Sequence, residues 1–245
     1  MSLLVDMGNT RLKWAIVEDS QITTGEPLLN EQITVHLLFK LWEDLKPPQQ
    51  LAIACVTANH RLELVIAVAL SLWSDVKITR VTAQAQAFGI SNSYAEPEKL
   101  GVDRWLAMCA ARQFYSLPAC IVDCGTAITI DLVNREGQHL GGFISPGLTL
   151  MKKSLVDGTD ALSFDSQNYA LAPANFTEAA IYGGTVLAAA GLIEKVLSKQ
   201  SKMTVILTGG DAELIAQHLS FTCTVDPDLV LCGLAIITDF QKGRP

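Results

Sequence analysis

Apolar residues along the chain form two kinds of run: short β-branched stretches and longer stretches with a helical period. The short stretches predict strands at residues 51–56, 76–81 and 203–207. The longer stretches predict helices at residues 61–73, 101–114, 177–197 and 229–240. The period is clearest in the second of these, where apolar side chains recur at i, i+3, i+4 and i+7: Val102, Trp105, Leu106 and Cys109. Strands and helices mixed in this order indicate an α/β fold.

A strand–turn–strand pattern occurs twice in the chain. Each copy has two apolar strands around a polar turn, at residues 3–5, 6–10 and 11–17, and at residues 119–122, 123–127 and 128–133. Both turns begin with Asp-x-Gly, at Asp6 and at Asp123. Two copies in matching contexts indicate two similar lobes. We expect the boundary between residues 113 and 119, with lobes at 1–116 and 117–245.

Composition and charge narrow the classes of function. The chain has 245 residues with 18 Lys and Arg against 25 Asp and Glu, a formal net charge of −7, so no nucleic-acid partner is expected. The N-terminus lacks the basic and apolar regions of a secretory signal. The most apolar run, residues 64–70, is far shorter than the roughly 20 residues of a spanning helix. We therefore expect a cytoplasmic protein with no membrane partner.

The six cysteines form no Cys-x-x-Cys pair and the four histidines form no His-x-x-x-His pair, so a zinc site is not expected. Buried, reduced thiols are the simpler interpretation.

Three glycine-containing turns offer phosphate or metal chemistry. The first combines the Asp6 carboxylate, a close-approach glycine at Gly8 and a cation at Lys13. The second contains Asp123, and the third lies at residues 208–211 between a predicted strand and helix. An ordinary hairpin turn or a tight connection remains the alternative for each. The Walker and dinucleotide glycine motifs and the Gly-x-Ser-x-Gly elbow are absent.

Five sequence motifs occur in order along the chain: Asp6-x-Gly-Asn-Thr-x-x-Lys13, Gly101-Val-Asp-Arg104, Asp123-x-Gly-Thr-Ala-x-Thr-x-Asp131, Gly141-Gly-Phe-Ile-Ser-Pro-Gly147 and Thr208-Gly-Gly-Asp-Ala212. In combination they resemble one family, the type III pantothenate kinases of the actin, hexokinase and heat-shock-chaperone ATPase superfamily. The resemblance follows the family's order over nearly the whole chain.

The resemblance implies two ribonuclease-H-like (actin-like ATPase) lobes with an active-site cleft between them. It also implies a homodimer that transfers phosphate from ATP, with Mg²⁺ and a monovalent cation (K⁺ or NH₄⁺), to the hydroxyl of pantothenate. The product is 4'-phosphopantothenate, and the reaction begins coenzyme A biosynthesis.

Site residues follow from the same resemblance. Implied ATP-binding residues are Asp6, Met7, Gly8, Asn9, Thr10, Arg11, Leu12, Lys13 and Thr126. Implied substrate-binding residues are Tyr94, Gly101, Val102, Asp103, Arg104 and, across the dimer interface, Thr185. Asp103 would be the catalytic base, Asp123 the monovalent-cation ligand, and Asp6 a ligand of Mg²⁺ through water.

Simpler roles remain open for several of these residues. Tyr94 could be a half-buried loop tyrosine, Thr185 could bond back to its own helical turn, and Asp103 with Arg104 could be an ordinary surface pair. A non-catalytic regulator on the same fold and a kinase for another hydroxy acid are the alternative functions. No motif assigns a role to residues 156–175.

Overall fold

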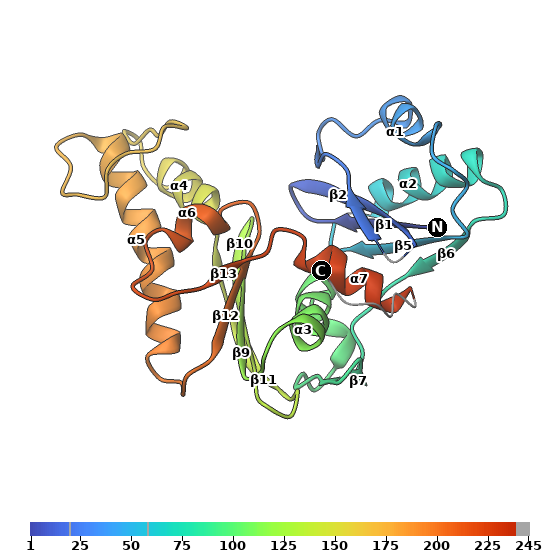
Figure 1. The fold of residues 1–245 in the computed structure, drawn as a ribbon. Coiled ribbons are helices and arrows are strands. Elements are labelled where there is room, and N and C mark those ends of the chain that lie inside the picture. Colours follow the sequence, from blue (N-terminus) through green and yellow to red (C-terminus); the bar gives the residue numbers. More distant parts are fainter. Residues whose placement is uncertain (20, 58, 239–245) are drawn as a thin grey trace. The chain divides into compact units, whose positions relative to one another are not determined.

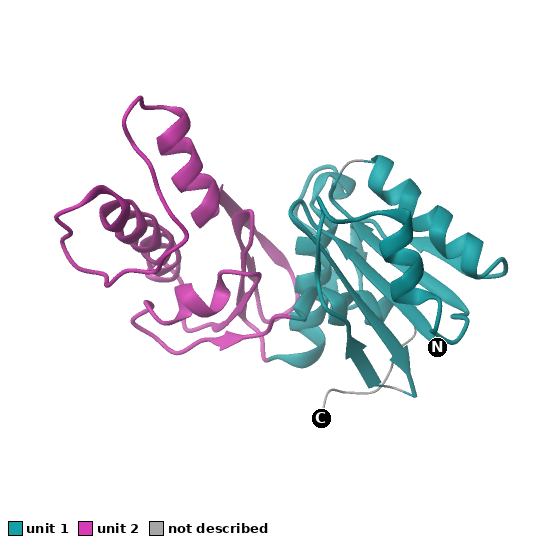
Figure 2. Cartoon of the chain, turned by 90° about the horizontal axis from the view of Figure 1, so that it is seen from above, with its two compact units in different colours: residues 1–115, 228–245 teal, residues 116–227 magenta. Residues whose placement is uncertain are grey.

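The chain forms two compact units in a computed structural model that describes residues 1–19, 21–57 and 59–238 (Figures 1 and 2). Unit 1 comprises Met1–Tyr115 together with a C-terminal segment that begins at Asp228. Unit 2 comprises Ser116–Pro227.

Unit 1 is built on a mixed sheet in the order β3-β2-β1-β5-β6, with β4 paired to β2. The strands of this sheet are β1 (Ser2–Met7), β2 (Arg11–Glu18), β3 (Gln21–Thr24), β4 (Leu28–Leu29), β5 (Gln50–Cys55) and β6 (Lys77–Arg80). Strands β7 (Gln86–Ala87) and β8 (Ile90–Ser91) form a separate two-stranded sheet. Its helices are α1 (Val35–Trp42), α2 (Asn59–Leu72), a 3₁₀ turn at Pro97–Lys99, α3 (Val102–Phe114) and α7 (Leu229–Ile237).

Unit 2 has a sheet in the order β11-β10-β9-β12-β13. Its strands are β9 (Ala119–Cys124), β10 (Ala127–Val133), β11 (His139–Pro146), β12 (Thr204–Thr208) and β13 (Thr224–Val225). Its helices are α4 (Leu148–Asp157), α5 (Thr177–Leu197) and α6 (Ala212–Ala216).

The two sheets have the same topology. In unit 1, β3, β2 and β1 are antiparallel neighbours, and β5 and β6 run parallel to β1. In unit 2, β11, β10 and β9 are antiparallel neighbours, and β12 and β13 run parallel to β9. Asp6 and Asp123 occupy the same place, one residue before the end of β1 and of β9. The repeated strand–turn–strand pattern therefore begins two similar α/β units, as the sequence predicted.

The expected lobes were residues 1–116 and 117–245. The compact units divide after Tyr115, and α7 lies in unit 1, where it packs against α3 and β1. Helices α3 and α7 cross closely at Gly233 of α7. A Cβ added there would collide with the carbonyl oxygen of Leu106 on α3. The predicted end of this helix at residue 240 lies outside the described residues.

One hydrophobic cluster of unit 1 lies on the face of its sheet that α1 and α2 cover, while α3 and α7 pack on the other face. Leu3, Val5 and Met7 of β1 pack with helices α1 and α2 in this cluster, which includes Trp42. Side chains alternate along a strand, so Asp6 lies on the other face of the sheet.

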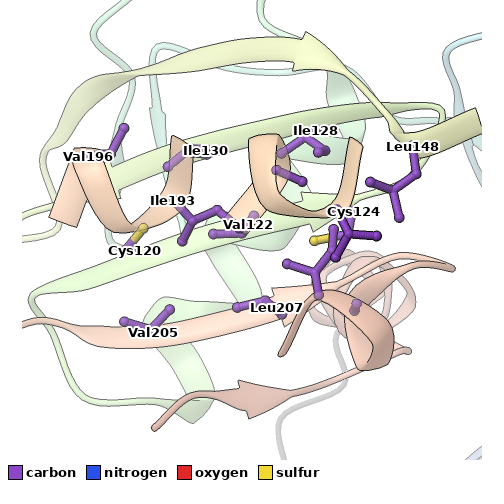
Figure 3. Close-up of a cluster of buried hydrophobic side chains, with 14 of the residues drawn as sticks. Cys120, Val122, Cys124, Ile128, Ile130, Leu148, Ile193, Val196, Val205 and Leu207 are labelled. Carbon is purple, nitrogen blue, oxygen red and sulfur yellow. The ribbon is translucent and has the colours of Figure 1, made fainter. Parts of the chain in front are cut away.

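Unit 2 repeats this arrangement. Cys120, Val122 and Cys124 of β9 pack against α5 in a cluster that includes Ile193 (Figure 3). Asp123 consequently lies on the sheet face that points away from this core.

Helix α5 spans residues 177–197, as predicted, and corrects one sequence expectation. Its 21 residues, with a mean hydropathy of 1.4 over its most apolar window, are long and apolar enough to cross a membrane. Half of that window is buried, and Tyr182 and Val186 lie in the core of unit 2. This burial is that of a core helix. Residues 64–70 are therefore not the longest apolar segment of the chain, since α5 exceeds them.

Candidate functional site

The first Asp-x-Gly turn connects β1 and β2 in unit 1. Asp6 pairs directly with Lys13 across the two strands, and its side chain is only 9% exposed. The Gly8 N–H donates to the Arg11 carbonyl at 3.0 Å, which closes the turn. An added Cβ at Gly8 would lie 3.2 Å from that oxygen, so a larger residue would strain the turn. A carboxylate and a lysine thus stand beside a compact backbone turn.

A residue that the sequence analysis did not select holds this turn from the side. The Asn30 side-chain amide donates to the carbonyls of Gly8 and Asn9, at 2.9 and 2.8 Å. Its backbone N–H donates to the Thr10 carbonyl at 2.9 Å. No sequence signal marks Asn30, because a single asparagine after a short strand is common at turns.

The second Asp-x-Gly turn connects β9 and β10 in unit 2. The Gly125 N–H donates to the Ala127 carbonyl at 3.1 Å, and Thr126 is exposed at its tip. An added Cβ at Gly125 would lie 3.2 Å from Asp123 Oδ1. The Asp123 carboxylate therefore borders bare backbone.

Strand β12 completes the surroundings of Asp123. Thr208 pairs with Asp123, and its buried Oγ1 has no hydrogen-bond partner among the described residues. Gly209 follows at φ +94°, where an added Cβ would lie 2.5 Å from Asp123 Oδ1. The Asp123 carboxylate and the Thr208 hydroxyl oxygen together fit a small cation, since such ions take oxygen ligands.

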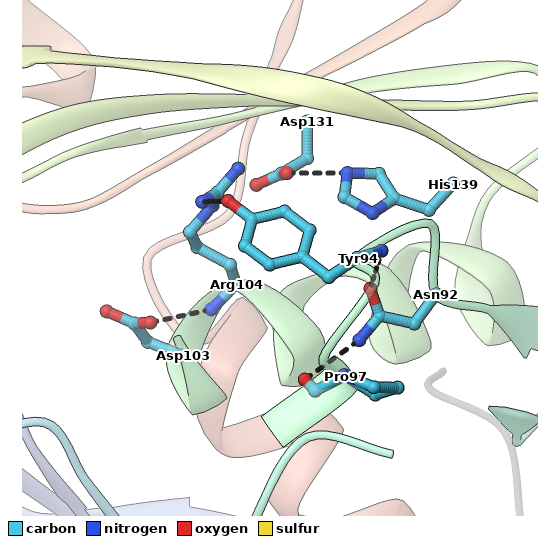
Figure 4. A network of polar contacts seen from close by, with 7 residues as sticks. All are labelled: Asn92, Tyr94, Pro97, Asp103, Arg104, Asp131 and His139. Carbon is cyan, nitrogen blue, oxygen red and sulfur yellow. Dashed lines mark hydrogen bonds and ion pairs between the residues drawn. The ribbon is translucent and has the colours of Figure 1, made fainter. Parts of the chain in front are cut away.

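A third group of site residues lies before and at the start of α3 (Figure 4). Arg104 is 6% exposed and donates from Nη1 to the Tyr94 hydroxyl at 2.9 Å. Asp103 Oδ1 accepts the Arg104 backbone N–H at 2.8 Å. The burial of Arg104 contradicts the alternative of an ordinary surface pair. These contacts bring three of the predicted substrate residues together.

The loop before α3 is ordered by its own polar contacts. Asn92 accepts the Tyr94 N–H at 3.0 Å and donates to the Pro97 carbonyl at 3.1 Å (Figure 4). At Gly101, which caps α3, an added Cβ would lie 2.5 Å from Asp103 Oδ1. The glycine therefore leaves room for the carboxylate at the positive end of the helix, a position that favours an anion.

Thr185 lies on α5 in unit 2 and is 5% exposed. Its hydroxyl donates to the Tyr182 carbonyl at 2.9 Å, which is the back-bonding that the sequence analysis held open. Thr185 also lines a hollow of about 580 Å³ between α4 and α5 that includes Met151 and Leu155. Its place in a substrate site stays a prediction.

Unit 2 also buries a polar pair outside the predicted site. His139 Nε2 and Asp131 Oδ1 lie 2.9 Å apart with both side chains almost fully buried (Figure 4).

The cysteines of both units are in the thiol form. Burial raises the pKa of the Cys109 thiol in unit 1 and of the Cys120 thiol in unit 2 to about 12, so they stay protonated near neutral pH. The six cysteines, all within the described residues, form no disulfide, and four of them are buried.

The site residues are divided between the units. Unit 1 carries the Asp6–Lys13 turn and the Tyr94–Arg104 group, whereas unit 2 carries Asp123, Thr126 and Thr185. The expected cleft between the lobes stays a prediction.

Comparison with solved structures defines the class of fold. The Baf family protein of Campylobacter jejuni is 22% identical, with a TM-score of 0.60 and coverage of 97% of both chains. The ethanolamine utilization protein EutJ of Carboxydothermus hydrogenoformans is 13% identical, with a TM-score of 0.54 and coverage of 96% of this chain and 88% of its own. With its two matching sheets, the chain has the two-lobed α/β fold of the actin-like ATPases.

Comparison with sequences defines the family. The family model of the type III pantothenate kinases matches residues 2–199. The type III pantothenate kinase of Nitrosococcus oceani is 35% identical over all of this chain and 96% of its own length. The Nitrosomonas eutropha relative of the same name is 36% identical over 96% of this chain and 93% of its own. The chain belongs to the type III pantothenate kinases.

Two buried threonines of unit 2 provide a test of the surroundings of Asp123. Thr208→Val should stabilise the cation-free protein by about 1 kcal/mol, because it removes a buried hydroxyl without a partner. Thr185→Val is the matched control and should destabilise by a similar amount, since it removes a made hydrogen bond. Chemical denaturation measures both. A less stable Thr208→Val would show that the Thr208 hydroxyl is paired in solution.

Proposed function

We propose that this chain is a cytoplasmic enzyme that transfers the γ-phosphoryl group of ATP to the terminal hydroxyl of pantothenate. Its relatives are named for this substrate. The observation that supports the assignment to these residues is the Asp103 carboxylate, anchored at the start of α3 beside the buried Arg104 and the half-buried Tyr94. Six cysteines that form no disulfide are consistent with the reducing cytoplasm.

Phosphoryl transfer depends on positioning and on charge stabilisation rather than on covalent chemistry from the protein. The turn from Asp6 to Lys13 supplies backbone N–H groups and a lysine for the ATP phosphates, and Thr126 contributes a hydroxyl from unit 2. Asp6 would hold Mg²⁺ through water, since this ion usually keeps several of its waters. Mg²⁺ would neutralise phosphate charge when bound.

On the substrate side, Asp103 orients the pantothenate hydroxyl and accepts its proton. Its anchored oxygen gives the side chain one direction, which is what a general base needs. Tyr94 and Arg104 hold the rest of pantothenate, with the guanidinium recognising the carboxylate. Gly101 and Val102 belong to the same substrate site because they begin α3 and so place Asp103 in its first turn.

Asp103→Asn should lower turnover by about 10²–10⁴-fold, or about 2.7–5.4 kcal/mol, because an amide cannot accept the proton. ATP affinity should change little, since the phosphate-binding turn is another segment. Steady-state turnover and calorimetry with ATP measure the two effects. Asp75→Asn, on an exposed carboxylate of unit 1, is the control.

A fall in turnover of less than about threefold would remove Asp103 from the role of base, since it lies far below the general-base range. The same assay separates the alternatives. Turnover without pantothenate would indicate an ATPase, and turnover with another hydroxy acid only would indicate a different kinase. No ATP consumption would favour a regulator.

Asp123 is the proposed ligand of a monovalent cation, K⁺ or NH₄⁺. The support is the fit of the site: a carboxylate oxygen bordered by Gly125 and Gly209, and the Thr208 hydroxyl on the paired strand. A cation there offsets the Asp123 charge within unit 2.

Potassium should stabilise the protein, by about 1.4 kcal/mol at ten times its dissociation constant, and Asp123→Ala should abolish that gain. Thermal unfolding in K⁺ and in choline buffers of equal ionic strength measures the stability gain, and turnover is measured in the same two buffers. Asp157→Ala removes an exposed carboxylate of the same unit and should keep the K⁺ effect. Equal stability and turnover of the wild type in both buffers would contradict the cation site.

A homodimer through α5 is the proposed assembly. The outer face of this helix carries exposed small or apolar residues at i, i+3, i+4 and i+7: Gly184, Leu187, Ala188 and Gly191. Leu187 is 58% exposed, and the hollow lined by Thr185 adjoins this stripe. A second copy would cover the stripe and place Thr185 near its partner's substrate.

Leu187→Lys should weaken dimerisation by at least about thirtyfold, because a charge would replace a central apolar contact. Analytical ultracentrifugation measures the dissociation constant, and the KM for pantothenate should rise in parallel. Leu70→Lys, on a 44% exposed leucine of α2, is the matched control and should leave the assembly unchanged. A dimer of wild-type affinity in Leu187→Lys would exclude this interface.

A further inference from the structure

The two Asp-x-Gly turns differ in length although their strands pair in the same way. Residues 8–11 lie between the paired Met7 and Leu12, whereas only residues 125–127 lie between the paired Cys124 and Ile128. The first turn therefore contains one additional residue, and an extra backbone carbonyl must be satisfied there.

A residue at the same topological place holds each turn. In unit 2 the Gly147 N–H donates to the Thr126 carbonyl at 2.9 Å, and a Cβ at this position would collide with the Gly125 carbonyl. In unit 1 the Asn30 N–H makes the equivalent bond to Thr10, also at 2.9 Å. The longer turn thus leaves room for a side chain where the shorter one requires glycine.

Asn30 uses that room to bind both carbonyls at the tip of the turn. Its Nδ2 has two hydrogens and two acceptors, the oxygens of Gly8 and Asn9. Because both partners are acceptors, the amide must present its nitrogen to them. Asn30 is 6% exposed, and its buried Oδ1 has no hydrogen-bond partner among the described residues.

The geometry of the peptide bond gives this contact a consequence for the turn. In a trans peptide the C=O and N–H point in opposite directions. Two carbonyls held toward Asn30 therefore direct the N–H groups of Asn9 and Thr10 to the opposite side of the turn. Successive N–H groups on one side form a concavity that binds anions.

We propose that Asn30 is a positioning residue that holds the Gly8–Thr10 turn in its phosphate-binding conformation. The proposal rests on the function proposed above, in which this turn binds the ATP phosphates. Asn30 acts through the backbone of the turn. Its Oδ1 is left without a hydrogen-bond partner among the described residues because its NH₂ group must face the two carbonyls. An aspartate of the same shape lacks that group.

The test compares ATP binding and kinetics in Asn30→Ala and the wild type. Loss of both side-chain bonds should raise the ATP dissociation constant and the KM for ATP about tenfold, as the turn loses its preformed shape. The KM for pantothenate and the turnover at saturating ATP should stay within about twofold, because chemistry and substrate contacts are untouched. Asn30→Asp should bind ATP more weakly than Asn30→Ala, since its charge repels the two carbonyls that it faces and adds negative charge near the phosphates on the opposite side of the turn.

Asn134→Ala is the matched control. Asn134 also holds a turn, by accepting the N–H groups of Glu136 and Gln138 in unit 2. Its loss should lower the unfolding temperature and leave ATP affinity unchanged. The same pattern in Asn30→Ala would show a purely structural role and overturn the proposal.

Asn30→Ser is the second variant if Asn30→Ala does not fold. A hydroxyl donates one hydrogen bond, so ATP affinity between those of the wild type and Asn30→Asp is expected, and wild-type affinity would overturn the proposal. A wild type that binds ATP but does not phosphorylate pantothenate would refute the proposed function alone. The binding comparison would still decide the role of Asn30.

Discussion

The alternation of side chains along β1 and β9 positions both the cores and the candidate site. Leu3, Val5 and Met7 pack on one face of the first sheet, so Asp6 lies on the other. A shift of one residue in the pairing would move Asp6 into the apolar core, at a cost far above that of any single contact in the turn. Apolar packing on one face thereby secures the carboxylate on the other, and β9 repeats the arrangement for Asp123.

Close backbone approach is the second constraint, and it separates the two turns. Gly147 and Gly209 pass so near the second turn that a side chain at either position would meet backbone or the Asp123 carboxylate. The first turn is longer and is held by the Asn30 side chain instead. One topology thus supports two turns of different length, each held by a different device.

Several features lay beyond sequence patterns for identifiable reasons. Strand β11 was not predicted because most of its side chains are exposed and its apolar residues do not alternate with polar ones. Helix α4 was not predicted although Leu148, Met151 and Leu155 lie at i, i+3 and i+7, because that period covers only ten residues. Helix α3 showed a single apolar stripe, yet every residue from 104 to 111 is buried. Packing against α7, which comes from the far end of the chain, buries much of the rest of this helix.

The sequence by itself determined the repeated strand–turn–strand units, the long helix α5 and the segments that carry the candidate site. These are local patterns of period and turn chemistry, which a stretch of ten to twenty residues contains in full. Only the tertiary structure decided that α7 belongs to unit 1, that Arg104 is buried against Tyr94, and that Asn30 holds the first turn. The α7 and Asn30 contacts join residues distant in the chain, and the Tyr94–Arg104 contact joins a loop to a helix. A contact of either kind leaves no period in the sequence of either partner.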